Sequence, residues 1–323
     1  MAVTSKDVAK RAGVSHATAS RAFSSPELVS KKTLERIMDA ARELNYVPNS
    51  LASSLKSSQP NTVGYIISNI KNNFFTDIAH KLQKQLYALD MNFMIGLSDE
   101  NADEEYRCML SQIAHRASMI LFTPSAYSAE CERRIKSTRN VRFIQLFRNC
   151  YSDVDSLIVK DRLGATIAVR TLLESGRRRI LLLDGESALP TGRREGYLDA
   201  FAEAGLVPDE RLLATLSLSG DRTQEIARLL DELSPDGIIP VSEFLTAQTV
   251  RVLRQRGVAV GRETGVVAYD DSPVAQALGI TVVGHDEERI ICEIQSMIRR
   301  AFEGNEAREH IELDPVLIRR GSE

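Results

Sequence analysis

From residue 62 to residue 323, short apolar runs alternate with segments whose apolar residues recur at helical spacing. The runs have the length of buried strands, and alternation of strands with helices predicts parallel sheets covered by helices. So long a stretch indicates two doubly wound lobes, in which ligands bind at the carboxyl ends of strands. The expected strands are 63–67, 93–97, 119–122, 143–146, 157–159, 180–183, 237–241 and 265–269, and helix candidates include 77–89, 165–173, 195–204 and 243–256.

The segment before this alternation is basic. Residues 1–60 hold nine Lys and Arg against five Asp and Glu, a charge of +4, whereas the whole chain carries -3. This asymmetry is expected when one end of a protein contacts phosphate. No apolar run approaches the ~18 residues of a spanning helix, and residues 4–7 are polar where a secretory signal would be apolar. We therefore expect a cytoplasmic protein without membrane contact.

The four cysteines show no spacing typical of a metal or redox site. They lie at positions 108, 131, 150 and 292, without a C-x-x-C pair and without histidines at zinc-site distances. Structural thiols in a reducing compartment are the better interpretation. We expect no metal and no cofactor.

Two short helices joined by a tight turn are predicted near the N-terminus. Thr4 and Asp7 have the spacing of a capping box that begins the first helix, and Gly13 ends it. Ser15 is suited to cap a second helix over residues 16–22. Such a pair forms a helix-turn-helix, and a third helix from Ser30 supplies an apolar face for packing.

The second helix has small residues on one side and candidate base-reading residues on the other. Ala19 and Ala22 allow close packing, while His16, Ala17 and Arg21 can face the base edges of a major groove. Short hydroxyl side chains suited to phosphate contact are Thr4, Ser15, Thr18 and Ser20. The alternative from pattern alone is a three-helix bundle whose polar residues are only solvated.

Several runs in this segment closely resemble the head of the LacI/GalR family of bacterial repressors. They are Asp7 to Ser15, Thr18 to Arg21, Val29-Ser30, and Asn45 to Asn49. The resemblance implies that His16, Ala17 and Arg21 occupy base-reading positions. It also implies that Tyr46 and Asn49 contact the DNA backbone, and that the protein is not an enzyme.

Residues 48–61 have the composition of a linker between a helix-turn-helix domain (1–47) and a sensor domain (62–323). Pro48 breaks the preceding helix, and residues 50–56 are helix-compatible but too short to be stable alone. A plain tether would have the same composition. The resemblance implies a hinge helix that folds on the operator, with Leu55 inserted into the minor groove and Ala52 allowing close approach across a dimer.

The resemblance continues through residues 68–75, 194–197 and 267–271, and therefore covers essentially the whole chain. It implies a periplasmic-binding-protein-like sensor of two lobes, 62–158 plus 286–308 and 159–285 plus 309–323, with a small-molecule effector between them. The effector-binding positions that it implies are Asn73, Phe74, Phe75, Arg148, Arg193, Asp270 and His285. From the residues alone, Phe74 and Phe75 are equally interpretable as core aromatics, and Arg148 and His285 as surface groups.

Departures from the family pattern bear on the effector. Phe147 stands where many members have an aspartate, and Ser242 and Glu243 stand where Asn-Asp is usual. The chain has no tryptophan, the best stacking platform for sugar rings. With Arg148, Arg193 and His285 as cleft cations, the sequence favours an anionic metabolite such as a sugar acid or phosphorylated sugar.

The sequence disfavours two other functional classes relative to a transcriptional repressor. An enzyme is disfavoured because the chain has no G-x-S-x-G, P-loop, paired histidine ligands or G-x-G-x-x-G. A periplasmic solute-binding protein has no use for a basic helix-turn-helix. We therefore expect a homodimer that binds a pseudo-palindromic double-stranded operator, since one such head buries too little surface for tight specific binding.

Overall fold

The computed structural model describes residues 3–46 and 62–323, and the chain divides into two units between residues 61 and 62. We call residues 3–46 the head and residues 62–323 the sensor. The predicted hinge residues Asn49, Ala52 and Leu55 lie outside the described residues. Within the described ranges, no helix is long and apolar enough to cross a membrane.

The head is a helix-turn-helix followed by a third helix, as predicted. Its elements are α1 (Ser5–Ala12), α2 (His16–Ser24), the short helix η1 (Pro26–Leu28) and α3 (Lys31–Glu43). Thr4 and Asp7 form the capping box, and Gly13 ends α1 with a φ of 63°, a conformation that favours glycine. The side chains of Ser15 and Ser30 accept backbone N–H groups at the starts of α2 and α3.

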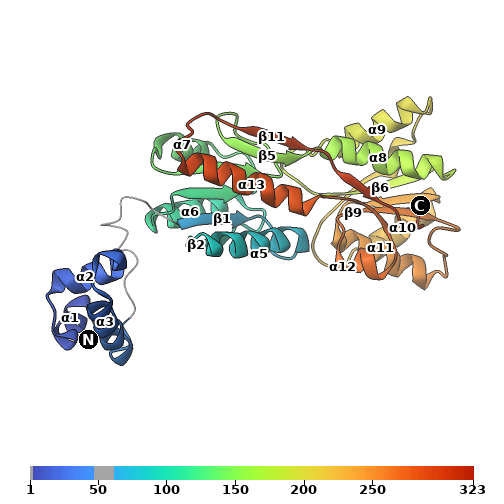
Figure 1. Cartoon of the computed structure of the whole chain (residues 1–323). Helices are drawn as coiled ribbons and strands as arrows, with labels where there is room; N and C mark the ends of the chain where they lie inside the picture. The colour runs from blue at the N-terminus through green and yellow to red at the C-terminus, as the bar shows by residue number, and fades with distance from the viewer. Residues whose placement is uncertain (1–2, 47–61) are drawn as a thin grey trace. The chain divides into compact units, whose positions relative to one another are not determined.

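The first lobe of the sensor is a six-stranded parallel sheet in the order β11-β5-β4-β3-β1-β2 (Figure 1). Its strands are β1 (Thr62–Ile67), β2 (Asn92–Leu97), β3 (Met119–Phe122), β4 (Arg142–Leu146), β5 (Asp155–Val159) and β11 (His310–Leu313). Its helices are α5 (Asn73–Ala88), α6 (Ala102–Ala114), α7 (Ala129–Ser137) and α13 (Glu287–Phe302). Apolar clusters fill the space on both faces of the sheet.

The second lobe repeats this arrangement in the order β12-β10-β9-β8-β6-β7, with β12 antiparallel to β10. Its strands are β6 (Ile180–Gly185), β7 (Leu213–Leu216), β8 (Gly237–Pro240), β9 (Gly265–Tyr269), β10 (Thr281–Gly284) and β12 (Val316–Ile318). Its helices are α8 (Asp161–Glu174), α9 (Arg193–Glu203), η2 (Glu210–Leu212), α10 (Thr223–Leu233), α11 (Glu243–Gln255) and α12 (Pro273–Ala277). Both predicted doubly wound lobes are therefore present.

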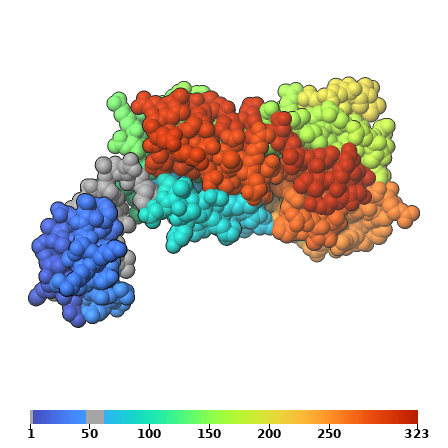
Figure 2. All heavy atoms as spheres, in the orientation of Figure 1, coloured from blue at the N-terminus to red at the C-terminus, as the bar shows by residue number. Residues whose placement is uncertain are grey.

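The chain passes between the lobes three times: between β5 and α8, between β10 and α13, and between β11 and β12. Figure 2 shows the C-terminal segments, in orange and red, extending over both lobes on one face. The predicted assignment of 309–323 to the second lobe is wrong at its start. β11 belongs to the first sheet, because Asp155, only 1% exposed, accepts the Glu309 N–H at 2.8 Å and pairs with Arg142.

Candidate functional site

Two sets of predicted functional residues fall on different units, and the head carries the DNA-contact set. His16, Ala17 and Arg21 are exposed on α2, whereas Ala19 and Ala22 are buried against the head core. The small residues therefore turn one side of the helix inward, as predicted, and leave the proposed base-reading residues accessible. An α-helix presented in this way is the element that enters a major groove in helix-turn-helix proteins.

The imidazole of His16 is held by a neighbour that sequence reasoning missed. Its Nε2 lies 2.9 Å from the hydroxyl oxygen of Ser5, the first residue of α1. This hydrogen bond ties the starts of α1 and α2 together and orients the ring. No local spacing pattern marks the pair, because the two residues are 11 positions apart.

The hydroxyl residues of the head are engaged in capping. Ser15 and Thr18 share a hydrogen bond of 2.8 Å between their side-chain oxygens, while Thr4 bonds the Asp7 carboxylate. Thr4 and Ser15 are exposed, and Thr18 and Ser20 are half-buried. Tyr46 is half-buried, and its ring centroid lies 5.4 Å from that of Phe23.

The sensor contains a cavity of about 370 Å³ between its two lobes. Both sides include residues at or near the carboxyl ends of strands. Phe147 and Arg148 follow β4, Asp161 follows β5, and Asp270 follows β9. This is the position at which open parallel sheets bind ligands.

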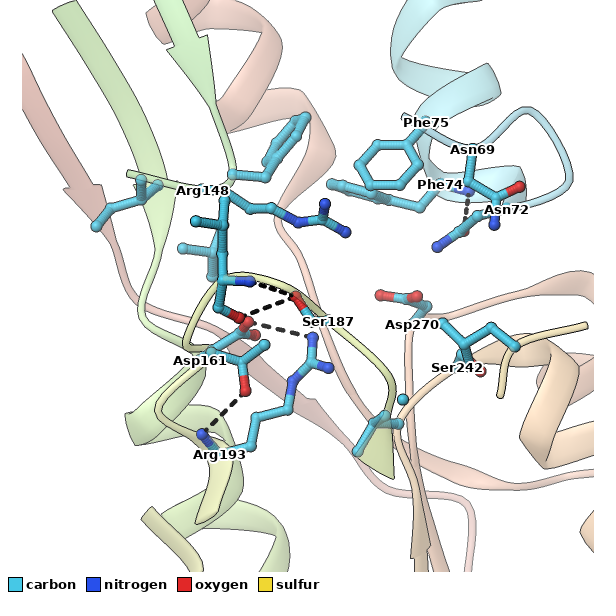
Figure 3. A pocket seen from close by; sticks show the side chains of 18 of the residues that line it. Asn69, Asn72, Phe74, Phe75, Arg148, Asp161, Ser187, Arg193, Ser242 and Asp270 are labelled. Carbon is cyan, nitrogen blue, oxygen red and sulfur yellow. Dashed lines mark hydrogen bonds and ion pairs between the residues drawn. The ribbon is translucent and has the colours of Figure 1, made fainter. Parts of the chain in front are cut away.

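The first-lobe wall of the cavity is aromatic (Figure 3). The ring centroid of Phe74 lies 4.8 Å from that of Phe147 and 4.5 Å from that of His285. Phe74 and Phe75 are 8% and 7% exposed, so they belong to the core and line the cavity as well. The two interpretations left open by the sequence therefore apply together. Asn69 and Asn72, also on this side, were missed.

Arg148 on the same side is fixed by an ion pair and a carbonyl. Its guanidinium donates to the Glu100 carboxylate at 2.5 and 2.9 Å and to the Pro124 carbonyl oxygen at 3.0 Å. The side chain is 23% exposed, which excludes the interpretation as an ordinary surface group. Paired planar contacts of this kind hold a guanidinium in one orientation.

The second-lobe wall is polar and centres on Arg193, at the start of α9. Its guanidinium lies 3.1 Å from Asp161, 3.3 Å from Asp184 and 5.0 Å from the ring centroid of Tyr269. Burial opposes the charge on Arg193, but the carboxylates, Asp161 foremost, outweigh burial and raise the pKa of this guanidinium. Arg193 is therefore a permanently charged, fixed group.

Asp270 and His285 meet at the connection between the lobes. His285 Nε2 lies 3.1 Å from an Asp270 carboxylate oxygen, and Figure 3 shows the Asp270 carboxylate pointing into the cavity. Asp270 has a φ of 63° and Phe147 a φ of 67°, values that non-glycine residues rarely adopt. Backbone strain of this kind gathers at binding sites, where surrounding structure enforces it.

Of the seven predicted effector-binding residues, six line this cavity. The exception is Asn73, which lines a small adjoining cavity instead. Lining residues that sequence reasoning missed include Asn69, Asn72, Glu100, Phe147, Lys160, Asp161 and Ser187. Phe147 and Lys160 come directly after predicted strands, so the strand-end rule could have found these two.

The described residues contain no group of three or more His, Cys, Asp and Glu side chains placed to hold a metal ion. All four cysteines are free thiols. Burial raises the pKa of the Cys131 and Cys150 thiols, which disfavours the reactive thiolate.

Comparison with known proteins finds relatives of both units. Residues 4–49 match the model of bacterial regulatory proteins of the lacI family, and residues 169–323 match a periplasmic binding protein-like domain. The chain is 25% identical to the transcriptional regulator DegA of Bacillus subtilis, over 100% of this chain and 98% of that protein. It is 26% identical to the transcriptional repressor PurR of Erwinia tasmaniensis, over 99% and 96%.

Residues 4–49 match the lacI family of bacterial regulatory proteins, and the whole chain is similar to regulators of that family. It is therefore a DNA-binding transcriptional regulator. Its relatives are regulators and not enzymes, which confirms the sequence-based exclusion of catalysis.

Solved structures of the family share the fold of the whole chain. The lac repressor dimer bound to operator and an anti-inducer superposes with a TM-score of 0.83 and 22% identity, covering 100% of this chain and 99% of that chain. The regulator CelR in complex with cellobiose gives a TM-score of 0.72 and 24% identity, covering 99% and 100%.

Proposed function

We propose that this regulator is a repressor whose affinity for its operator is controlled by a small molecule bound between the two lobes. This proposal rests on the cavity of about 370 Å³, which is lined by residues from both lobes. A ligand held from both sides changes how the lobes approach each other. The two arrangements of the lobes are then two states, and both the ligand and the operator can shift the equilibrium between them.

The head supplies the operator contacts in this proposal. His16, Ala17 and Arg21 read base edges, and the hydroxyls of Thr4, Ser15, Thr18 and Ser20, with Tyr46, contact the backbone. Asn49 extends the backbone contacts, Leu55 opens the minor groove, and Ala52 allows two hinge helices to pack. Residues 48–61 thereby connect a reading domain to a sensing domain.

A homodimer on a pseudo-palindromic operator is part of the same proposal. On the first lobe, β2 is an edge strand whose side chains Ile95 and Leu97 are 53% and 43% exposed. Tyr87 and Leu89, at the end of the neighbouring α5, are 84% and 64% exposed. An edge with this much exposed apolar surface favours pairing with a second copy.

The test is a gel shift with the DNA upstream of the chain's own gene and its neighbours. We expect a salt-sensitive, sequence-specific complex of two chains per operator, because the head carries the positive charge. A chain that stays monomeric by light scattering, both free and with this DNA, would contradict the proposed dimer. Absence of a specific shift would contradict operator binding.

A further inference from the structure

The cations of the cleft are already paired with carboxylates. Arg148 binds Glu100, and Arg193 lies between Asp161 and Asp184. An anionic ligand at either guanidinium has to compete with these carboxylates, which remain close by and repel it. The sequence-based preference for a sugar acid or phosphorylated sugar rested on free cations, and the geometry therefore favours another class of ligand.

Asp270 lines the cavity, and no lysine or arginine is paired with it among the described residues. Its carboxylate lies 3.1 Å from His285 Nε2. The carboxylate points into the cavity beside the amide of Asn72 (Figure 3). It is therefore placed to accept hydrogen bonds from a ligand.

Asp270 also lines a second, smaller cavity of about 20 Å³ that adjoins the first. A space of this size holds about one water-sized group. Asp77 on α5, Glu243 at the start of α11 and Asp270 surround it, and no lysine or arginine is among the described residues in its wall. Two further carboxylates of the wall are neutralised elsewhere, Asp271 by Arg320 and Glu287 by Lys81.

Two observations favour a positively charged hydrogen-bond donor in this small cavity. Burial and then the neighbouring Asp270 and Asp77 raise the pKa of Glu243, although the Asn73 amide donates a hydrogen bond to its carboxylate. His285 Nδ1 is buried without a hydrogen-bond partner in the part of the chain that the structure describes. A group that donates hydrogen bonds and carries positive charge would satisfy the carboxylates directly.

We infer that the effector is a small hydroxylated molecule bearing a protonated amine. The ammonium group occupies the small cavity between Asp77, Glu243 and Asp270, and the body of the molecule lies in the larger cavity against the Phe74 ring. A bare metal ion fits less well, because the described residues offer no metal-binding group there. This inference rests on the proposed effector role of the cleft.

A matched series of hexoses that differ mainly in charge tests the inference. D-glucosamine, D-glucose and D-glucuronate are titrated calorimetrically into the full-length protein, and calcium chloride is titrated separately. We expect D-glucosamine to bind at least about tenfold more tightly than D-glucose, since a charge-assisted hydrogen bond contributes more than a neutral one, and D-glucuronate to bind most weakly.

Two nearly isosteric variants test whether the preference for D-glucosamine over D-glucose arises in the small cavity. Asp270→Asn and Glu243→Gln should each reduce the preference for D-glucosamine over D-glucose to about threefold or less, since each removes one charge and little volume. Glu130→Gln, which removes an exposed carboxylate on α7, is the matched control and should keep the full preference. Thermal unfolding of each variant without ligand checks that it is folded.

The possible results separate this inference from the proposed function. Tightest binding of D-glucuronate, equal binding of the three hexoses, no binding of any up to about 10 mM, or binding of calcium alone would overturn it. If D-glucuronate binds best and alters operator affinity, the amine inference fails while effector control stands. If D-glucosamine binds with the expected preference yet leaves operator affinity unchanged, the ligand class assigned to the cleft stands and effector control by this cleft fails.

Discussion

The head and the sensor place their functional side chains in opposite ways. In the head, the proposed base-reading residues His16, Ala17 and Arg21 lie within one helix turn or two of each other on α2. In the sensor, the cavity is lined from the ends of strands in both lobes, and its ion pairs join distant segments: Arg148 and Glu100 are 48 positions apart. Local chemistry therefore defines the first site, and tertiary structure defines the second.

Because of this difference, substitutions should affect the two units differently. A substitution on an exposed helix face changes what the head contacts but little of how it folds. A substitution among the paired charges of the cleft changes both, because it leaves a partner without its counter-charge.

The largest effect is expected from Arg193→Ala. It leaves Asp161 and Asp184, both about four-fifths buried, facing each other without a cation, so the sensor should lose about 3–5 kcal/mol of unfolding free energy. Chemical denaturation measures this loss of unfolding free energy, with the unfolding of the sensor and of the head followed separately. Arg162→Ala, which breaks the exposed pair with Asp199, is the control and should cost about 1 kcal/mol or less. Equal losses in the two variants would contradict the contrast.

Arg21→Ala should leave both units folded and weaken operator binding by about 1–3 kcal/mol, with relaxed preference at one operator position. Selection from a randomised operator library measures the preference. Arg42→Ala removes an exposed cation on α3 that pairs with Asp39, and it should leave the preference unchanged. An unaltered sequence preference in Arg21→Ala would mean that α2 does not read bases through this residue.

The two units should respond to pH with opposite signs. In the sensor, burial raises the pKa of Glu105 to about 7, so the folded state holds a proton that the unfolded chain releases above pH 4.5. Sensor stability should fall as pH rises through this window, and Glu105→Gln should abolish about 1–2 kcal/mol of that loss. In the head, hydrogen bonds from Thr4 lower the pKa of Asp7, and stability is lost instead as pH falls through that lowered pKa.

Denaturation at pH 5 and pH 8 measures the Glu105 effect. Glu104→Gln, an exposed neighbour on the same helix that pairs with Arg107, is the control and should keep the pH dependence. A wild-type sensor that is equally stable at both pH values would show that the Glu105 carboxyl is not protonated in the folded state.

The smallest effect is expected from Ser5→Ala. Loss of the hydroxyl frees the His16 ring, so preference at the base pair that His16 contacts should relax by about 0.5–1 kcal/mol while preference at the Arg21 position stays. Ser5→Thr keeps the hydroxyl and should restore the preference. Relaxation at every position alike would instead indicate a general weakening of the head.

Much of the head follows from sequence because its determinants are local. Thr4 with Asp7, and Ser15 with Thr18, are hydrogen-bonded within three positions, so spacing alone predicts them. The Ser5 to His16 bond escapes prediction because it joins two helices. In the sensor, strand ends predict several lining residues, but Arg193 and Asp161 are 32 positions apart, and only the fold shows that they neutralise each other.

The same reason explains two features of the sensor that the sequence analysis did not include. The free cations that favoured an anionic effector are paired by carboxylates from other segments. The boundary placed before residue 309 ignored β11, a four-residue strand whose pairing with β5 depends on the buried Asp155. Neither pairing leaves a periodic signal in the sequence.

The central claim is that the cleft and the operator act on one shared equilibrium, and reciprocity tests it most directly. The measurement is the affinity of full-length protein for its operator with and without saturating D-glucosamine, and the affinity for D-glucosamine with and without operator. Both affinities should change by the same factor, of the order of 5–150-fold. Operator affinity that is identical with and without the bound ligand would contradict this claim, even if each ligand binds tightly alone.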